Sequence, residues 1–408
     1  MNRVQGSFHV VVFCAVASWF GAPIAAAQDG ALTLEAALER ARGHAVAIVS
    51  ARYKLEEARA RLGGARALRD NPVVEGALGR RGDDLPNDFE LGLSQSFELG
   101  GRRGGRIRAA EAAVDREGAS AADIRARALR EVALAFLRAL AARERVRLAA
   151  AAEGHGESVL RIAERRHAAG DVAVLDVNLA AGALARTRSA ARAAAATESL
   201  ALGELRVLLA LPPDTALTLS GEVGPRPTRD LAALLAAAAT RADIRAADAE
   251  LREAQAEIDV GKGMRWPDVT PAVRYERDEG TNVLWGGVSL SLPLSRHGQD
   301  VRGVAEARAA RVQAELAALR HAARIEVESA FEAQRLRLEA LAVMRETAAR
   351  YEENETLARR SYDVGQIGLA ELLLVRRETV DAQIVHLERR LDAAEGEVEL
   401  LARAGVLQ

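Results

Sequence analysis

Strand-like alternation gives way to a helical composition within residues 89–103, which read Phe-Glu-Leu-Gly-Leu-Ser-Gln-Ser-Phe-Glu-Leu-Gly-Gly-Arg-Arg. Phe89, Leu91, Leu93 and Phe97 alternate with small or polar residues, and this period of two predicts a β-strand with one apolar face. From residue 102 to residue 169 the chain is rich in Ala, Leu, Glu and Arg and has no proline. It therefore predicts a single helix of about 100 Å at about 1.5 Å per residue.

The same succession occurs a second time, 195 positions further along the chain. Leu93-Ser94-Gln95-Ser96 falls on Val288-Ser289-Leu290-Ser291, Gly170 falls on Gly365, and Asp176 falls on Glu371. A constant offset over about 100 residues indicates a tandem duplication. We expect a first repeat over residues 28–211, a Pro- and Gly-containing linker over 212–229, and a second repeat over 230–408.

Each repeat is predicted to contain the same elements in the same order. A helix comes first, over residues 34–69 or 231–262, and two short strands separated by a polar turn follow. The run 73–80 is the weakest of the four predicted strands. A long helix, a turn at Gly170 or Gly365, and a returning helix of about 35 residues complete the repeat. The predicted fold class is therefore mainly α with a small β part, built on duplicated helical hairpins.

The composition and the N-terminus restrict the class of protein. Aromatic residues make up only 3% of the 408 residues, and the formal net charge of −2 offers no basic field, so no nucleic-acid partner is expected. A basic Arg3, an apolar run over 10–20 and small residues at 25–27 predict a signal peptide over residues 1–27, with a buried N-terminal helix as the alternative. The single cysteine, Cys14, lies inside this segment, so the mature chain would carry no disulfide and no reactive thiol.

The predicted strands are about as long as membrane strands, but four of them cannot close a barrel. Because an open edge in lipid leaves backbone groups unpaired, several chains would have to share one barrel. Trp266 and Trp285 flank the second hairpin, as residues of an interfacial aromatic girdle would. The alternative is a small soluble sheet that caps a coiled coil. The predicted lipid face consists of the apolar residues of the alternating runs: Phe89, Leu91, Leu93, Phe97, Val273, Tyr275, Leu284, Val288, Leu290 and Leu292.

Together these features resemble the TolC-type outer-membrane efflux family and, within it, the CzcC-like heavy-metal branch. That branch typically reads Glu-Leu-Gly-Gly-Lys-Arg at the junction of strand and helix, and this chain reads Glu98-Leu99-Gly100-Gly101-Arg102-Arg103. The resemblance implies a homotrimer with a shared 12-stranded barrel in the outer membrane and a periplasmic α-helical barrel. It also implies two protein partners, a periplasmic adaptor and an inner-membrane RND pump.

The same resemblance gives roles to the two helical turns. It implies that the tips face the adaptor, although a plain helix-turn glycine explains them as well. Asp176 and Glu371, six residues past each tip glycine, would help to constrict a periplasmic aperture. Three copies would form rings of carboxylates that favour cations, and the alternative is a solvated helix position. Ile367 stands where the best-known member has a basic residue, so a salt bridge at the gate does not carry over. The predicted tip residues are Gly170, Asp171, Val172, Gly365, Gln366, Ile367 and Gly368.

The sequence contains no pattern for catalysis or for a cofactor. The histidines are scattered without metal-ligand spacing, and there is no nucleophile elbow or complete phosphate loop. We therefore expect no enzyme, no cofactor and no specific metal site. The function expected is a passive exit duct for divalent heavy-metal cations. The alternatives are a drug or protein export duct on the same fold, and a periplasmic coiled-coil protein that never enters a membrane.

Overall fold

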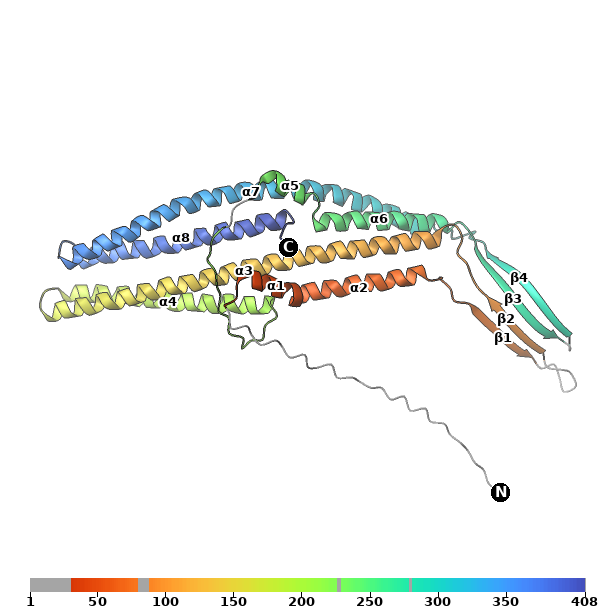
Figure 1. Ribbon diagram of the computed structural model, residues 1–408, viewed down its shortest axis with the longest axis horizontal. Helices are drawn as coiled ribbons and strands as arrows, with labels where there is room; N and C mark the ends of the chain where they lie inside the picture. Colours follow the sequence, from red (N-terminus) through yellow and green to blue (C-terminus); the bar gives the residue numbers. More distant parts are fainter. Residues whose placement is uncertain (1–30, 80–87, 226–228, 279–280, 408) are drawn as a thin grey trace, which may run out of the picture.

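The structure is a computed structural model, and it describes residues 31–79, 88–225, 229–278 and 281–407. The predicted signal peptide and the polar turn predicted between the first two strands, which contains Pro86, lie outside these residues. The molecule is long and narrow, with a β-sheet at one end, two helical hairpin tips at the other and short helices near the middle (Figure 1). This arrangement confirms the predicted fold class, mainly helical with four antiparallel strands.

Two unbroken helices run from the sheet to the tips. Helix α3 spans Arg102–Ala168 and α7 spans Gln299–Asp363, which are 67 and 65 residues. Each is followed by a returning helix of 35 residues, α4 over Val174–Leu208 and α8 over Leu369–Arg403. Since α8 begins 195 residues after α4, the offset found in the sequence also holds for these helices.

The remaining helices complete a wall that is four helices wide. Helix α2 (Val46–Arg66) lies end to end with α4, and α6 (Ala242–Gly263) lies end to end with α8 (Figure 1). Across the wall the order is α2/α4, α3, α6/α8 and α7 (Figure 1). The outer edges of this wall within the chain are therefore α2/α4 on one side and α7 on the other.

The predicted first helix of each repeat is in fact two helices. Helix α1 (Leu34–His44) ends at Ala45, whose ψ of 124° is extended, and α5 (Leu231–Ala238) is separated from α6 by three residues. Good helix formers continue through both breaks, so propensity does not cause them. Tertiary packing does, because α1 buries Ala37 and Ala41 completely beside Phe136 of α3, and α5 buries Leu234 beside α7.

The predicted linker, or equatorial segment, packs onto the helical wall. Leu219 and Val223 are 2% and 3% exposed and belong to the central hydrophobic cluster. Leu219 also forms an isolated parallel bridge with Leu32. Arg143 donates to the Leu219 carbonyl, and Arg390 donates to the Val223 carbonyl at 2.7 Å. The segment is therefore bound along the middle of the helical wall.

The four strands form one antiparallel sheet in the order β1-β2-β3-β4. Strand β1 is Val73–Gly79, β2 is Asp88–Ser94, β3 is Asp268–Asp278 and β4 is Thr281–Ser291. Pairing of β2 with β3 joins the two halves of the chain. The outer strands, β1 and β4, have no further strand beside them among the residues described.

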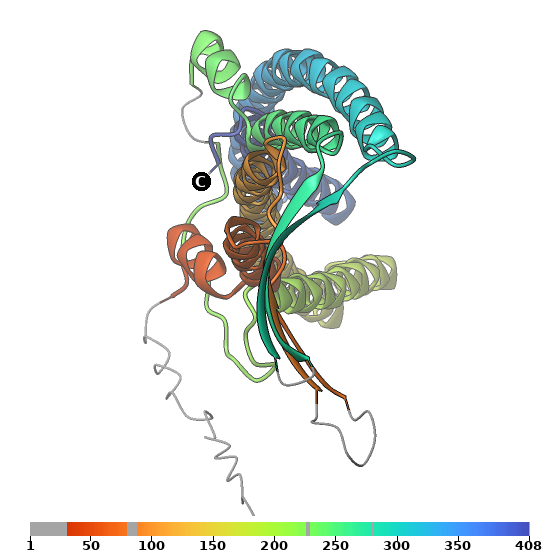
Figure 2. The ribbon, with the colours of Figure 1, turned by 90° about the vertical axis from the view of Figure 1, so that its right-hand side faces the viewer.

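Viewed from the sheet end, the sheet and the helical wall curve around one side (Figure 2). Helices α1 and α5 and the C-terminal end of the chain lie on the other, convex side (Figure 2). Within the described part of the chain, none of the helices combines the length and the apolar character needed to cross a membrane.

Candidate functional site

The strand register places the ten predicted lipid-face residues on one side of the sheet. Directly opposed residues in antiparallel strands point to the same face, and Leu91 opposes Tyr275, which opposes Leu284. Because every second residue of a strand points to the same side, the other predicted residues of β2, β3 and β4 lie on this face as well. Phe97 belongs to it through its bridge to Val269. Leu292 directly follows β4. Contact of this face with lipid stays a prediction.

The other face of the sheet carries charge. Glu75, Glu90, Arg274 and Glu276 share it, and Arg274 pairs with Glu90 at 2.8 Å. Trp285 opposes Arg274 and therefore belongs to this polar face. Trp285 therefore does not share the predicted lipid face, and an interfacial girdle on that face could not include it, because the period of two turns it to the other side of the sheet.

A compact polar joint connects the sheet to the helices. Arg102, whose side chain is 8% exposed, forms an ion pair with Asp268 at the start of β3. Burial lowers the pKa of Arg102, against the opposing effect of the nearby Glu98 carboxylate. Glu98 in turn accepts from Arg106 at 2.5 Å. The junction motif, residues 98–103, thus holds the strands to the first turns of α3. The periodicity of the sequence did not reveal this contact.

The two tips share one backbone geometry. Gly170 and Gly365 have φ of 85° and 77°, a region that favours glycine. The N–H of Asp171 donates to the Arg166 carbonyl at 2.8 Å, and the N–H of Gln366 donates to the Ser361 carbonyl at 2.8 Å. These bonds close both hairpins with the helix-ending motif that glycine allows.

A hydrophobic tip cluster joins the two hairpins. Tyr362 is its largest buried member, and Ile367 packs against it from the second turn. The guanidinium of Arg166 lies 5.2 Å from the centre of the Tyr362 ring, which adds a cation–π contact between α3 and α7. The buried members of the cluster are Val159, Ala163, Ala180, Tyr362, Leu369 and Leu372.

The two aperture candidates lie in equivalent places. Asp176 is in the first turn of α4 and is half-buried, whereas Glu371 is in the first turn of α8 and is exposed. Neither carboxylate forms an ion pair within the part of the chain that the structure describes. The fold therefore does not bring them together in one copy, and any ring of carboxylates requires further copies.

Arg376 is a charged residue near the tips that sequence reasoning missed. Its side chain is 15% exposed, and its Nε lies 3.3 Å from Oε1 of Glu355 across the α7–α8 interface. Burial lowers its pKa. The residue 195 positions earlier is Ala181, so the internal repeat gave no signal for it.

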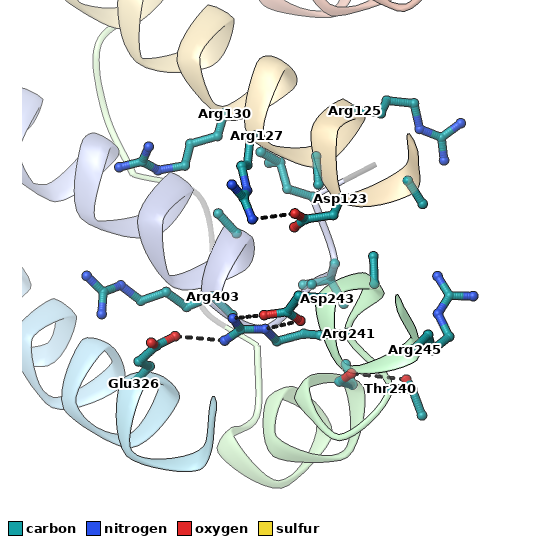
Figure 3. Close-up of a pocket in the computed structure, with 18 of the residues that line it drawn as sticks. Asp123, Arg125, Arg127, Arg130, Thr240, Arg241, Asp243, Arg245, Glu326 and Arg403 are labelled. Carbon is teal, nitrogen blue, oxygen red and sulfur yellow. Dashed lines mark hydrogen bonds and ion pairs between the residues drawn. The ribbon is translucent and has the colours of Figure 1, made fainter. Parts of the chain in front are cut away.

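A cavity of about 640 Å³ lies where α8 and α6 meet end to end (Figure 3). Arg241 occupies its centre and donates to Asp243, to Glu326 at 2.7 Å and to the Arg403 carbonyl at 3.2 Å. One guanidinium thereby joins the α5–α6 turn to α7 and α8, and we interpret the cavity as a structural joint. No group of three or more His, Cys, Asp or Glu residues that could hold a metal ion occurs among the described residues.

The fold is that of solved outer-membrane channels. The Campylobacter jejuni CmeC outer membrane channel superposes with a TM-score of 0.78 at 16% identity, covering 100% of this chain and 94% of that one. CusC gives 0.74 at 18% identity, with 91% of this chain and 92% of that chain covered.

Sequence comparison identifies the family, which the fold alone does not. The model of the outer membrane efflux protein family matches residues 37–210 and again 234–406, so the chain belongs to that family of non-enzymatic channel proteins. It is 28% identical over 269 residues to the cobalt-zinc-cadmium resistance protein CzcC of Cupriavidus metallidurans, covering 65% of this chain and 63% of CzcC. It is 29% identical over 295 residues to the pyoverdine export outer membrane protein OpmQ of Pseudomonas aeruginosa, covering 65% and 59%. The chain thus aligns with about three fifths of the length of these curated relatives.

Proposed function

We propose that the chain is the outer-membrane exit duct of a tripartite RND-type efflux system, assembled as a homotrimer. The observation that carries this proposal is the sheet, which has one apolar face and two open edges. In lipid each unpaired backbone group costs several kcal/mol, so β1 and β4 need partners from other copies. Three copies supply twelve strands, which is within the range of bacterial barrels.

The helical wall supports assembly from several copies. Large apolar side chains are exposed along both of its outer edges, and several of them recur at spacings that are multiples of seven, as in the seam of a coiled coil. Neighbouring copies would cover both rows if the α7 edge of one met the α2/α4 edge of the next. The first of these rows consists of Leu336, Val343 and Leu357 on α7 and Val364 directly after it, and the second consists of Val46, Tyr53, Leu179, Leu200 and Val207 on α2 and α4.

The charges support cations as cargo. The polar face of the sheet, which would line the barrel, carries Glu75, Glu90 and Glu276 against Arg274. Asp176 and Glu371 would add carboxylate rings near the tips. Rings of carboxylates raise the local concentration of cations, and weak binding at such rings allows passage.

Divalent heavy-metal ions are the proposed cargo because of the junction motif over residues 98–103. CzcC is named for cobalt, zinc and cadmium resistance, but OpmQ, named for pyoverdine export, is equally similar. Percentage identity therefore does not separate a metal duct from a siderophore, drug or protein duct. The tips would contact a periplasmic adaptor, and the energy for export would come from an inner-membrane pump.

Growth of a deletion strain on zinc, cobalt, cadmium, copper, dyes and antibiotics tests the cargo. We expect sensitivity to metals alone, and restoration by the intact gene. Restoration by a gene carrying both Asp176→Asn and Glu371→Gln should be weaker, while Glu204→Gln, at an exposed position near the other end of α4, serves as the matched control. Sensitivity to dyes or antibiotics alone would exclude the metal assignment and leave the duct standing. Absence of the protein from the outer-membrane fraction would exclude the duct itself.

A further inference from the structure

A second cavity, of about 690 Å³, lies where the helical wall meets the sheet. Its charged lining residues are Arg108 from α3, and Asp259, Lys262 and Arg265 from α6 and the turn that follows it. Trp266, which is 62% exposed and lies two residues before β3, completes the lining of this cavity, which we call the rim cavity. Lys262 is one of only two lysines in the chain.

The charge of the rim cavity is positive. Asp259 is its only carboxylate and pairs both with Arg108 at 2.9 Å and with Lys262 at 3.5 Å. Arg265 is exposed and forms no ion pair with the described residues. Three cations against one anion leave a net charge of +2, and no carboxylate in the cavity is left to balance Arg265.

The rim cavity opens on the convex side of the wall. It shares Arg108, Asp259 and Lys262 with the next cavity along the α3–α6 groove. That cavity shares residues with a third, which reaches the turn between α5 and α6. Because α5 lies on the convex side (Figure 2), this groove and the rim cavity face away from the enclosed side.

Two exposed apolar side chains, those of Phe97 and Leu99, come shortly before the glycines that line the rim cavity. Phe97 is 43% exposed and belongs to the apolar face of the sheet through its bridge to Val269. Leu99 is 40% exposed and directly precedes the glycine that lines the cavity. The basic residues and the tryptophan of the rim cavity thus lie near the end of the sheet at which its apolar face begins.

We propose that the rim cavity binds the phosphate headgroup of an anionic glycerophospholipid, with the acyl chains against Phe97 and Leu99. This inference rests on the proposed membrane insertion of the sheet. Lys262 and Arg265 attract the headgroup charge, and Trp266 lies at the boundary between headgroup and hydrocarbon. The phosphate chemistry alone would also suit a free phosphate ion, and the membrane position favours the lipid.

Quenching of Trp266 fluorescence tests the proposal directly. The mature chain has only two tryptophans, so a Trp285→Phe background leaves Trp266 as the single reporter. The assembled full-length protein is reconstituted into mixed vesicles in which either the phosphatidylglycerol or the phosphatidylcholine carries brominated acyl chains. We expect stronger quenching by brominated phosphatidylglycerol. That preference should fall about fivefold for each cation removed by Lys262→Gln or Arg265→Gln. Lys54→Gln, at the other lysine, should leave it unchanged.

Each other outcome has a distinct meaning. Equal quenching by the two lipids in the Trp285→Phe protein would overturn the headgroup site while leaving the duct in place. Inorganic phosphate that raises the melting temperature and abolishes the lipid preference would show that the cavity takes a free ion, which also overturns the proposal. No quenching by either lipid would place Trp266 away from the bilayer and would contradict the proposed membrane insertion.

Discussion

A close approach between α6 and α7 predicts a strong effect of adding one methyl group. Gly261, near the end of α6, faces the first turn of α7. A Cβ built on Gly261 lies 2.8 Å from the backbone N of Arg302 and 2.9 Å from its Cα. Ordinary contacts begin at 3.4 Å, so α7 would have to retreat by roughly 0.6 Å. The obstacle is backbone, and a rotamer change cannot relieve it.

The Gly261→Ala substitution should therefore destabilise the protein. Overpacking typically costs about 1–3 kcal/mol, and the gain in helix propensity from Gly to Ala is about 1 kcal/mol. We expect a net loss of up to about 2 kcal/mol. The purified protein is unfolded with denaturant in detergent, the loss of helix is monitored by circular dichroism, and the midpoint of the transition is compared with that of the unsubstituted protein.

Gly303→Ala is the matched control for this substitution. Gly303 lies in the same turn of α7 as Arg302, and no atom lies within 4 Å of a Cβ built on it. This change should leave the midpoint unchanged or raise it. If Gly261→Ala changed the midpoint in the same way as Gly303→Ala, the close α6–α7 contact would be refuted.

Three further predictions concern the core, the joint and the response to pH. Phe136→Ala, at 2% exposure in the central cluster, should lower the unfolding free energy by about 3–5 kcal/mol in the same assay, and a loss below 1 kcal/mol would contradict its burial. Asp268→Asn removes the carboxylate paired with the buried guanidinium of Arg102 and should cost about 2–3 kcal/mol, less than for a fully buried pair because Asp268 is 26% exposed and the Glu98 carboxylate remains nearby. Burial, with the nearby charge of Arg390, lowers the pKa of His386 below its ordinary value of 6.5. The unfolded chain therefore binds the proton more readily, and stability falls as the pH drops below about 6.5. His386→Asn should reduce that fall between pH 7 and 5, and an unchanged pH profile would refute it.

Elements with a long period or a regular alternation were predictable from the sequence. The first long helix, predicted over residues 102–169, spans Arg102–Ala168, and the second ends two residues before its predicted turn glycine, Gly365, because no proline or glycine turn interrupts either helix before its tip. The sheet was predictable because the period of two persisted in three runs and Val73–Gly79 showed a weaker form of it. Because the sequence repeats with an offset of 195 residues, each weakly predicted element had an equivalent element in the other repeat to support it.

Features that depend on contacts between distant segments were not predictable. The helix break at Ala45 arises because α1 packs on α3, and nothing in the local sequence marks it. The same holds for the pairing of Arg102 with Asp268, which are 166 residues apart, and for the burial of Arg376. The side of the sheet on which Trp285 lies follows from its parity along the strand and not from its position beside a hairpin.

The internal repeat has a consequence for how such a molecule arises. Within one chain, β2 meets β3 and α3 meets α6, so the first half presents one edge to the second half. In the proposed trimer, β4 and α7 would present the equivalent edge to β1 and α2 of the next copy. A half-length chain with these elements would meet the same kind of neighbour on both sides. Six such chains would therefore close the same ring, and gene fusion would halve the number of subunits while letting the two halves diverge, as Arg376 and Ala181 have done.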